Sequence, residues 1–380
     1  MTVEFPGYAE MDCPPPLDRP PRILICAVQV PFVSGGAESH IESLRREFAA
    51  RDYLVDVIRL PFKWYPPRQI INDVLAWRLL DLTHSYGMPV DLAVVTRFPS
   101  YCIRHPRKVA WVLHQHRQAY DFLNTDLSDF NDSPDDDEVR KCLYELDSRS
   151  LRECRRIYAN SQNVAGRMKR FLDIESTPLY HPPPLTGRYR TEEYGDYIFT
   201  AGRLERNKRV DLLLQTLAAT DRPVRAVIAG RGPMEPDLRE MAAELGVSDR
   251  VSFAGFISDE ELLSHYARCG AVWYGPLDED YGYVTLEAFL SAKPVITVCD
   301  SGGVLEFVED GVTGYVGQPG AEAMAAQLNR WHESPSRGRD MGEAGRERVC
   351  RLSWDHVIDA LTGVLRDDIA RVHRRNGGSQ

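Results

Sequence analysis

Short apolar runs alternate along this chain with longer stretches in which apolar residues recur every three or four positions. The short runs predict buried strands, and the periodic stretches predict amphipathic helices. In the first half, strands are predicted at residues 22–28, 54–60, 92–96, 109–113 and 157–159. Helices are predicted between them, at about residues 37–50, 70–82, 138–154 and 162–171. Such alternation predicts a parallel, doubly wound sheet.

The alternation starts again after three consecutive prolines at residues 182–184. Consecutive prolines favour a stiff, extended segment, so this run is interpreted as a linker. Strands are predicted beyond it at residues 197–201, 225–229, 251–254, 271–274 and 295–298. Glycine turns follow strands in both halves, and such turns bring backbone close to a ligand. The fold class is therefore α/β, with two Rossmann-like domains and a ligand expected in the cleft between them.

Four segments divide the chain. Residues 1–20 are predicted to be a flexible, proline-rich extension without the features of a secretory signal. Residues 21–184 and 185–353 are the two predicted Rossmann-like domains. In residues 354–373, apolar side chains recur at helical spacing, which predicts a helix with one apolar stripe and Ser353 as its cap.

The composition narrows the class of protein. With 380 residues, 43% of them hydrophobic and 27% charged, the chain is typical of a globular protein of two domains. A formal net charge of −10 argues against general binding of nucleic acid. Its eight cysteines are dispersed without a C-x-x-C pair, which favours free thiols in a reducing cytoplasm.

The richest candidate chemistry lies at residues 275–298. An acidic loop around Gly282 leads into a short helix, and Glu279 and Glu287 stand eight residues apart. A helix amino end suits a phosphate, and a carboxylate beside a phosphate site commonly holds ribose or sugar hydroxyls. The alternative is a helix-capping acid next to a loop acid.

Two cations follow the strand at residues 197–201. Arg203 and Lys208 flank the next turn and are suited to hold a diphosphate, the arginine by its planar fork and the lysine as a point charge. Neighbouring Arg206 and Arg209 keep open the alternative of a solvated basic turn. Further candidate substrate contacts follow other strand ends: Gly230, Gly232, Phe256, Asp280, Tyr281, Gly282, Tyr283 and Val284.

In the first half, His114 and His116 come directly after the strand at residues 109–113. Two histidines at the mouth of the predicted cleft favour contact with substrate, and packing inside the protein is the alternative. H-x-H also fits a metal, but no carboxylate stands at a ligand spacing, so no metal site is predicted. The acidic stretch at residues 124–138 lacks the spacing of a calcium loop and is interpreted as mobile and solvated, or as a flap over an acceptor.

These motifs together resemble glycosyltransferase family 4. Those that match, in family order from about residue 22 to 360, are G-G-A-E, A-N-S, G-R-L-x-x-x-K, G-x-G-P, E-D-Y-G-Y-V-T-L-E-A, S-A-K-P-V-I, S-G-G-x-x-E and M-G-E-A-G-R-x-R-V…S-W. The resemblance implies a GT-B fold, a C-terminal helix that crosses back to the first domain, and retaining transfer from a nucleotide sugar without metal or cofactor. Tyr281 stands where the family commonly has Phe, and the acidic stretch has no counterpart in it.

The resemblance also implies roles for single residues. Arg203 and Lys208 would carry the diphosphate, and Glu287 would bind the ribose. Glu279 would hold hydroxyls of the donor sugar. Three residues of the first half complete the set. Gly35 and Gly36 would admit the sugar phosphate closely, and His114 would polarise the sugar near its anomeric carbon.

The expected function is therefore transfer of a sugar from a UDP- or GDP-linked donor to a hydroxyl of a glycan or glycolipid, in the biosynthesis of cell-surface polysaccharide or glycolipid. Seven basic residues in the run 149–170 add the expectation of peripheral contact with an anionic membrane from the cytoplasmic side. Two alternatives stay open, a nucleotide-sugar epimerase or hydrolase and a non-catalytic subunit of the same fold. The identity of donor and acceptor and the oligomeric state are not specified by these motifs.

Overall fold

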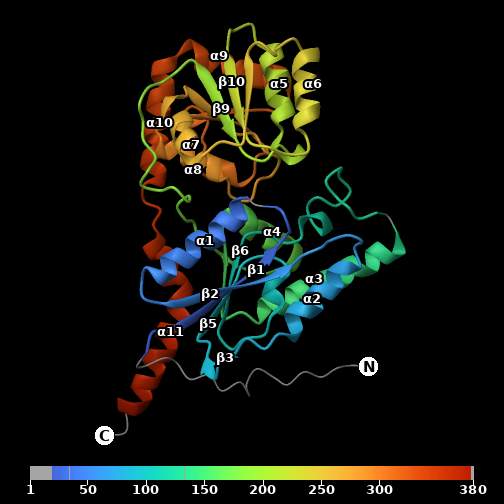
Figure 1. The fold of residues 1–380 in the computed structure, drawn as a ribbon, viewed down its shortest axis with the longest axis vertical. Coiled ribbons are helices and arrows are strands. Elements are labelled where there is room, and N and C mark those ends of the chain that lie inside the picture. Colours follow the sequence, from blue (N-terminus) through green and yellow to red (C-terminus); the bar gives the residue numbers. More distant parts are fainter. Residues whose placement is uncertain (1–18, 34, 132, 378–380) are drawn as a thin grey trace. The chain divides into compact units, whose positions relative to one another are not determined.

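A computed structural model describes residues 19–33, 35–131 and 133–377 (Figure 1). Most of the predicted extension at residues 1–20 thus lies outside the described residues. The chain divides into two compact units. Unit 1 comprises the chain up to His181 and again from Ser353 onward, and unit 2 comprises Pro182–Leu352.

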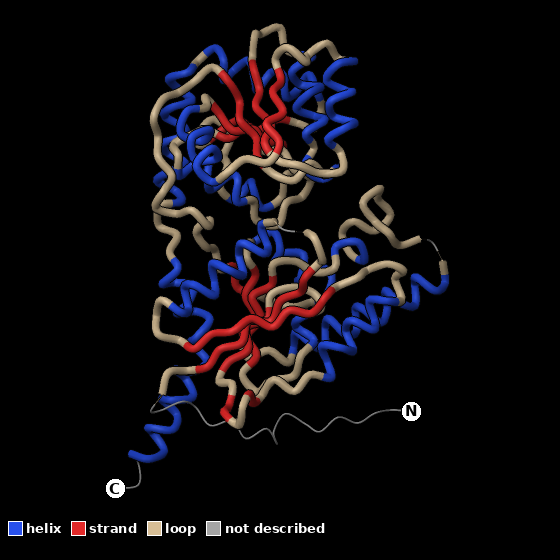
Figure 2. Tube along the Cα trace, in the orientation of Figure 1, coloured by secondary structure: helices blue, strands red, loops and turns tan. Residues whose placement is uncertain are grey.

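Unit 1 is built on a six-stranded parallel sheet with the strand order β2-β1-β5-β6-β7-β8. Figure 2 draws the strands in red. Its strands are β1 (Arg22–Gln29), β2 (Leu54–Pro61), β5 (Leu92–Val95), β6 (Lys108–Val112), β7 (Arg156–Ala159) and β8 (Thr177–Pro178). Its helices are α1 (Gly36–Ala49), α2 (Gln69–Leu79), α3 (Pro134–Arg152) and α4 (Gln162–Leu172). The central strands β5 and β6 are wholly buried, which explains the continuous apolar sequence of β5 and of β6 after Lys108.

Unit 2 repeats this plan, with a parallel sheet in the order β11-β10-β9-β12-β13-β14. Its strands are β9 (Tyr197–Ala201), β10 (Arg225–Ala229), β11 (Val251–Gly255), β12 (Ala271–Trp273), β13 (Val295–Val298) and β14 (Gly314–Gly317). Its helices are α5 (Val210–Ala219), α6 (Glu235–Glu244), α7 (Asp259–Arg268), α8 (Tyr283–Leu290), α9 (Ala321–Glu333) and α10 (Pro335–Val349). Both doubly wound sheets are thereby confirmed.

The last helix, α11 (Trp354–Gly377), belongs to unit 1. Its apolar stripe is buried in the same cluster as the apolar residues of β1 and α1. At its start, the backbone N–H of His356 donates to Ser353 Oγ at 3.3 Å, as expected of a capping serine. Further along, Asp368 pairs with Arg107 at 2.8 Å and with Arg155 at 3.0 Å. Apolar burial and ion pairs therefore both attach α11 to unit 1.

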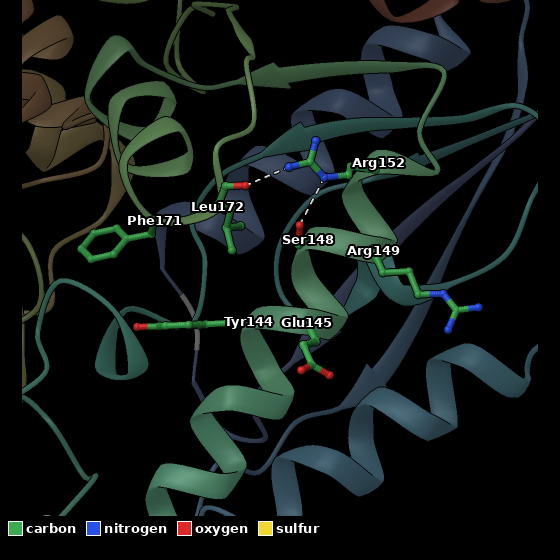
Figure 3. Close-up of a pocket in the computed structure, with 7 residues that line it drawn as sticks. All are labelled: Tyr144, Glu145, Ser148, Arg149, Arg152, Phe171 and Leu172. Carbon is green, nitrogen blue, oxygen red and sulfur yellow. Dashed lines mark hydrogen bonds between the residues drawn. The ribbon is translucent and has the colours of Figure 1, made fainter. Parts of the chain in front are cut away.

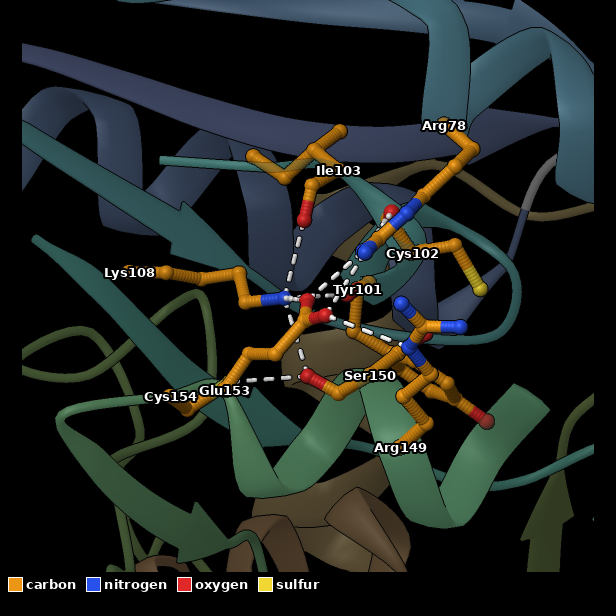
Figure 4. A network of polar contacts seen from close by, with 9 residues as sticks. All are labelled: Arg78, Tyr101, Cys102, Ile103, Lys108, Arg149, Ser150, Glu153 and Cys154. Carbon is orange, nitrogen blue, oxygen red and sulfur yellow. Dashed lines mark hydrogen bonds and ion pairs between the residues drawn. The ribbon is translucent and has the colours of Figure 1, made fainter. Parts of the chain in front are cut away.

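On the face of the unit 1 sheet opposite to α11, a buried lysine forms the centre of a polar network (Figure 4). Lys108, which is fully buried, donates to the carbonyls of Tyr101, Ile103 and Ser150 at 2.8–3.0 Å. Its ammonium also pairs with Glu153 at 3.2 Å, and Glu153 accepts two further hydrogen bonds from Arg78, each of 2.6 Å. Each charged group therefore has a hydrogen-bonded partner of opposite charge, as burial requires, although Lys108 and Arg78 share the one carboxylate of Glu153. The network connects β6 with α2 and α3.

Candidate functional site

At the carboxyl ends of β9 and β10, two glycine loops of unit 2 lie in direct backbone contact. A Cβ on Gly230 would stand 1.8 Å from the carbonyl oxygen of Gly202, and one on Gly232 would stand 2.3 Å from that of Leu204. Gly230 also has a positive φ of 123°. Both predicted glycines are thus required by the approach of two loops, and the loops lie at the sheet edge where ligands bind in this class of fold.

The predicted cations lie next to this edge. Lys208, at the end of the short helix η4 (Arg206–Lys208), pairs with Glu279, although the two residues are far apart in sequence. Tyr274 donates its hydroxyl to Glu279 at 2.8 Å. Arg203 is more exposed and pairs with Glu205 at 2.6 Å. The structure therefore brings Lys208 and Glu279 together, which the sequence suggested only as separate contacts.

The amino end of α8 faces the same loop. Gly282 precedes the helix with φ 84° and, as a glycine, has no side chain with which to cap this end. Its first N–H groups and the positive end of the helix dipole are suited to an anion. One turn on, Glu287 accepts a hydrogen bond of 2.7 Å from Tyr266. Burial raises the pKa of Glu287 above its ordinary value.

The remaining predicted contacts of unit 2 differ in exposure. Phe256, which follows β11, is 79% exposed, whereas Tyr281 is 5% exposed and packs against Phe307. The loop that holds Asp280 packs directly against the backbone of Gly303. A Cβ on Gly303 would stand only 2.5 Å from the carbonyl oxygen of Asp280, so no larger residue fits there. Tyr283 and Val284 form the first turn of α8 and are partly buried.

Sequence reasoning missed the residue that holds these loops together. Arg209, considered only as part of a solvated basic turn, forms a two-pronged ion pair with Asp300 at 2.5 and 2.9 Å. It also donates to the carbonyls of Gly275 and Pro276, at 2.8 Å each. Its φ of 49° is a left-handed conformation that is uncommon for a non-glycine residue, and these contacts stabilise it. Arg209 thereby ties η4 to the loop that carries Glu279.

In unit 1, the glycine turn after β1 leads into α1. Gly35 occupies the capping position, and Gly36 is the first residue of the helix. Glu38 accepts the backbone N–H of Gly35 at 2.9 Å and pairs with Arg97 at 3.2 Å. Arg97 also donates to the carbonyl of Val28 at 2.8 Å, at the end of β1. This pair of charges, which was not predicted, fixes the geometry of the turn.

His114 lies where β6 ends. Its Nδ1 is 2.7 Å from the carbonyl oxygen of Gln115, which fixes the orientation of the ring. Burial, with the charges of Arg97, Arg117 and Arg167, lowers the pKa of His114 to about 3. The imidazole is therefore neutral at physiological pH and can exchange hydrogen bonds with a sugar hydroxyl.

His116 occupies a different environment. Only 8% of it is exposed, and its ring centroid lies 5.7–6.0 Å from those of Phe62, Phe98 and Phe130. Burial lowers its pKa to about 4. An imidazole enclosed by three aromatic rings fits the packing alternative better than the predicted contact with substrate.

The acidic stretch is more ordered than its composition indicates. Phe130 is buried against His116, and α3 begins at Pro134, four residues before the helix predicted at residue 138. Ser133 caps this helix by accepting the N–H of Asp136 at 3.1 Å. Three aspartates in its first turn stabilise the positive end of the helix dipole. The acids after residue 133 are thus helix-start residues, and the interpretation of the whole stretch as a mobile loop was wrong.

The basic run at residues 149–170 is largely engaged within unit 1. Arg155 and Arg156 pair with Asp368 and Asp367 of α11, and Arg167 pairs with Asp121 at 3.2 Å. Arg152 donates to the carbonyl of Leu172 at 3.1 Å (Figure 3). A shallow depression of about 450 Å³ lies here, lined by Tyr144, Glu145, Ser148, Arg149, Arg152, Phe171 and Leu172.

Acid is expected to destabilise unit 1 through its buried histidines. Burial lowers the pKa of His40 to about 3 and that of His105 to about 4, so both contribute stability that is present above pH 6.5 and lost as the pH falls toward those values. Asp147 acts in the opposite sense, because burial raises its pKa to about 7 and its stabilising effect is lost as the pH rises through that value.

We therefore expect the protection of unit 1 against hydrogen exchange to fall between pH 7 and 5, and to fall more steeply in Asp147→Asn. Unit 2, whose two histidines are His265 and His332, serves as the internal reference. Equal losses in both units, or an unchanged slope in the variant, would refute this assignment.

The described residues hold no group of three or more His, Cys, Asp or Glu side chains that could bind a metal ion. Over the same residues, no helix combines the length and apolar character needed to cross a bilayer. The seven cysteines in the described part of the chain are all free thiols.

Comparison with known proteins identifies related sequences. Residues 188–348 match the family model described as glycosyl transferases group 1. D-inositol 3-phosphate glycosyltransferase of Mycolicibacterium smegmatis is 34% identical over 171 residues, which cover 42% of this chain and 37% of that protein. O-antigen chain mannosyltransferase C of Escherichia coli is 28% identical over 363 residues, 88% of this chain and 95% of the relative. The chain spans less than two thirds of the first of these relatives.

Solved structures decide the architecture. Sucrose-phosphate synthase from Thermosynechococcus elongatus superposes with a TM-score of 0.67 at 17% identity, covering 94% of this chain and all of that one. WaaG, a glycosyltransferase involved in lipopolysaccharide biosynthesis, superposes with a TM-score of 0.60 at 15% identity, over 90% of this chain and all of that one. The chain has the GT-B fold. Within this GT-B chain, the group 1 match covers most of unit 2, which carries Arg203, Lys208, Glu279 and Glu287.

Proposed function

We propose that the chain is a retaining glycosyltransferase that moves a sugar from a nucleoside diphosphate to an acceptor hydroxyl. The observation that carries the proposal is the arrangement in unit 2, where Lys208 pairs with Glu279 beside the amino end of α8, the helix that carries Glu287. The cations and the helix end are suited to the diphosphate of such a donor. The two carboxylates are suited to its sugar and its ribose.

The chemistry follows from these charges. As the bond between the anomeric carbon and the diphosphate oxygen breaks, its electron pair stays with the leaving diphosphate. Arg203, Lys208 and the helix end stabilise that charge without a metal ion. Retention follows if the acceptor hydroxyl attacks from the face that the diphosphate leaves and gives its proton to the departing diphosphate oxygen. No pair of carboxylates around the anomeric carbon is then needed.

Each unit carries proposed contacts of its own. In unit 2, Glu287 would hold the ribose and Glu279 the hydroxyls of the donor sugar. In unit 1, the turn at Gly35 and Gly36 would accept the sugar phosphate, and neutral His114 would hydrogen-bond to the sugar.

The names of related proteins support the substrate classes. One relative, from Mycobacterium tuberculosis, is named a GDP-mannose-dependent mannosyltransferase acting on phosphatidylinositol monomannoside, and HepE of Anabaena was solved with UDP-glucose. We propose a UDP- or GDP-sugar as donor and a glycan or glycolipid as acceptor. Contact with an anionic membrane stays a prediction, now resting on exposed cations such as Arg149 and Arg170.

Incubation with UDP-glucose and with GDP-mannose is expected to release a nucleoside diphosphate from one of them, with unchanged rate in excess EDTA. Full loss of activity on chelation, restored by Mg²⁺ or Mn²⁺, would contradict metal independence. Release of free sugar alone in the presence of glycan acceptors would favour the hydrolase alternative, and an isomerised donor would favour an epimerase. Binding of nucleotide without turnover of any donor would indicate a non-catalytic subunit.

A further inference from the structure

A row of aromatic rings leads outward from the buried His116 of unit 1. Phe62 lies 5.9 Å from His116 between ring centroids, Trp64 lies 6.1 Å from Phe62, and Tyr65 lies 5.5 Å from Trp64. All three aromatic residues follow the carboxyl end of β2, the sheet edge at which β6 delivers His114. Exposure increases along the row, from the buried histidine to Tyr65, which is 56% exposed. The row therefore begins in the core and ends in solvent.

A carboxylate from the acidic stretch lies beside these rings. The indole Nε1 of Trp64 donates to Asp129 at 2.7 Å, and Gln118 donates to the same oxygen, Oδ2, at 2.9 Å. Asp129 is itself exposed. Two donors thus hold the carboxylate in one orientation, and its other oxygen, Oδ1, can accept a hydrogen bond from a ligand.

The charge around this feature disfavours an anion. Residues 121–138 contain eight acidic residues and no Lys or Arg. The nearby cation Lys63 lies 5.0 Å from the centre of the Tyr65 ring, and Arg117 and Arg167 both pair with Asp121. A phosphate or carboxylate group entering here would meet a negative potential.

We propose that Trp64, Tyr65 and Asp129 form a subsite for a neutral sugar ring of the acceptor. The apolar C–H face of a pyranose is matched by an exposed aromatic ring, and its hydroxyls are matched by an oriented carboxylate. This subsite deepens the proposed function, on which it rests. It specifies the acceptor as a glycan with an uncharged sugar ring at the position that contacts Trp64, Tyr65 and Asp129. It also gives the acidic stretch a role in recognition, because that stretch supplies Asp129.

The first test reads sugar binding without any donor. In the full-length ¹⁵N-labelled protein, the indole N–H signal of Trp64 is assigned from its loss in Trp64→Phe. Titration with methyl α-D-mannopyranoside or methyl α-D-glucopyranoside is expected to shift this signal saturably, and mannose 1-phosphate is expected to shift it less. The proposal is overturned if neither neutral glycoside moves the signal, or if the sugar phosphate moves it more.

A kinetic test separates the subsite from the donor reaction. Trp64→Ala and Tyr65→Ala are each expected to raise the KM for a glycan acceptor about tenfold, the value of one aromatic contact, while hydrolysis of the donor without acceptor stays unchanged. Asp129→Asn, which keeps the shape of the side chain, is expected to raise the acceptor KM as well. An unchanged acceptor KM in all three variants would refute the subsite.

The matched control is Tyr86→Ala. Tyr86 is fully exposed in the turn between β3 (His84–Ser85) and β4 (Met88–Pro89), which precedes β5 and so lies at the opposite edge of the sheet. Tyr86→Ala should leave the acceptor KM and the rate of donor hydrolysis unchanged. An increase in its acceptor KM equal to that of the subsite variants would likewise refute the subsite. Absence of donor turnover in the unaltered protein would contradict the proposed function, but the titration would still judge the sugar subsite.

Discussion

Lys208→Ala is expected to lower the rate of sugar transfer by roughly 10²–10³-fold, the loss typical of removing one fixed electrostatic stabiliser from a site of developing charge. Lys208 is held in place within unit 2, since it pairs with Glu279 and stands on a turn that Arg209 fixes. Arg203→Ala should have an effect of the same order. Steady-state release of the nucleoside diphosphate measures both.

Arg206→Ala is the matched control for these two variants. Arg206 is an exposed arginine in the same turn, between the two proposed diphosphate ligands, and has no role in the proposed site. It should keep near-normal turnover. If Lys208→Ala and Arg203→Ala also kept it while retaining the circular dichroism of the folded protein, the diphosphate assignment would be wrong.

Part of the loss in Lys208→Ala would come from the partner left behind. Without the ammonium, the carboxylate of Glu279 would face the diphosphate with its charge uncompensated. The double variant Lys208→Ala/Glu279→Gln removes that repulsion. A double variant more active than Lys208→Ala would show that the two side chains act as a coupled pair, and additive losses would show that they act separately.

The sequence predicted the strands of both sheets because the central strands are buried on both faces and read as continuous apolar runs. It did not predict β3, β4 or β8, each two residues long, since a pattern of two residues carries no periodicity. It also missed β14, whose four residues G-Y-V-G include two glycines, a residue that strands disfavour. It placed the start of α3 four residues late, because the aspartates after Ser133 were interpreted as loop residues instead of a helix start.

In the candidate site, too, features formed by neighbouring residues could be predicted, and most contacts between distant residues could not. Glycines and charges at strand ends could be identified because strand and turn are adjacent in sequence. The role of Arg209 could not, since it depends on Asp300, a partner delivered by another segment of the chain. Tyr274 lies close to Glu279 in sequence, but only the turn between them brings its hydroxyl to the carboxylate. For His116, the enclosing rings come from three separate segments, so packing could be stated only as an alternative.

Removal of α11 is expected to unfold unit 1 and to leave unit 2 folded. Five apolar residues of this helix, each no more than 3% exposed, belong to a buried cluster of unit 1: Val357, Ile358, Leu361, Val364 and Leu365. Deleting a single buried leucine side chain costs about 2–5 kcal/mol, against a total of about 5–15 kcal/mol for a typical domain. A chain ending at Ser353 would lose all five residues and the ion pairs of Asp368. Segment-resolved hydrogen exchange should show protection lost in β1 and β5 and kept in β9 and β12.

A point variant tests the same inference in a chain of full length. Leu361→Ala, at a fully buried position, should lower the free energy of unfolding of unit 1 by about 2–5 kcal/mol. Asp359→Ala is the control, because Asp359 is an exposed residue of the same helix that pairs only with Arg366 among the described contacts, and it should change stability by less than about 1 kcal/mol. Equal protection of unit 1 in the truncated and full-length chains would show that α11 does not complete its core. Destabilisation of unit 2 by Leu361→Ala would instead mean that the two units unfold together.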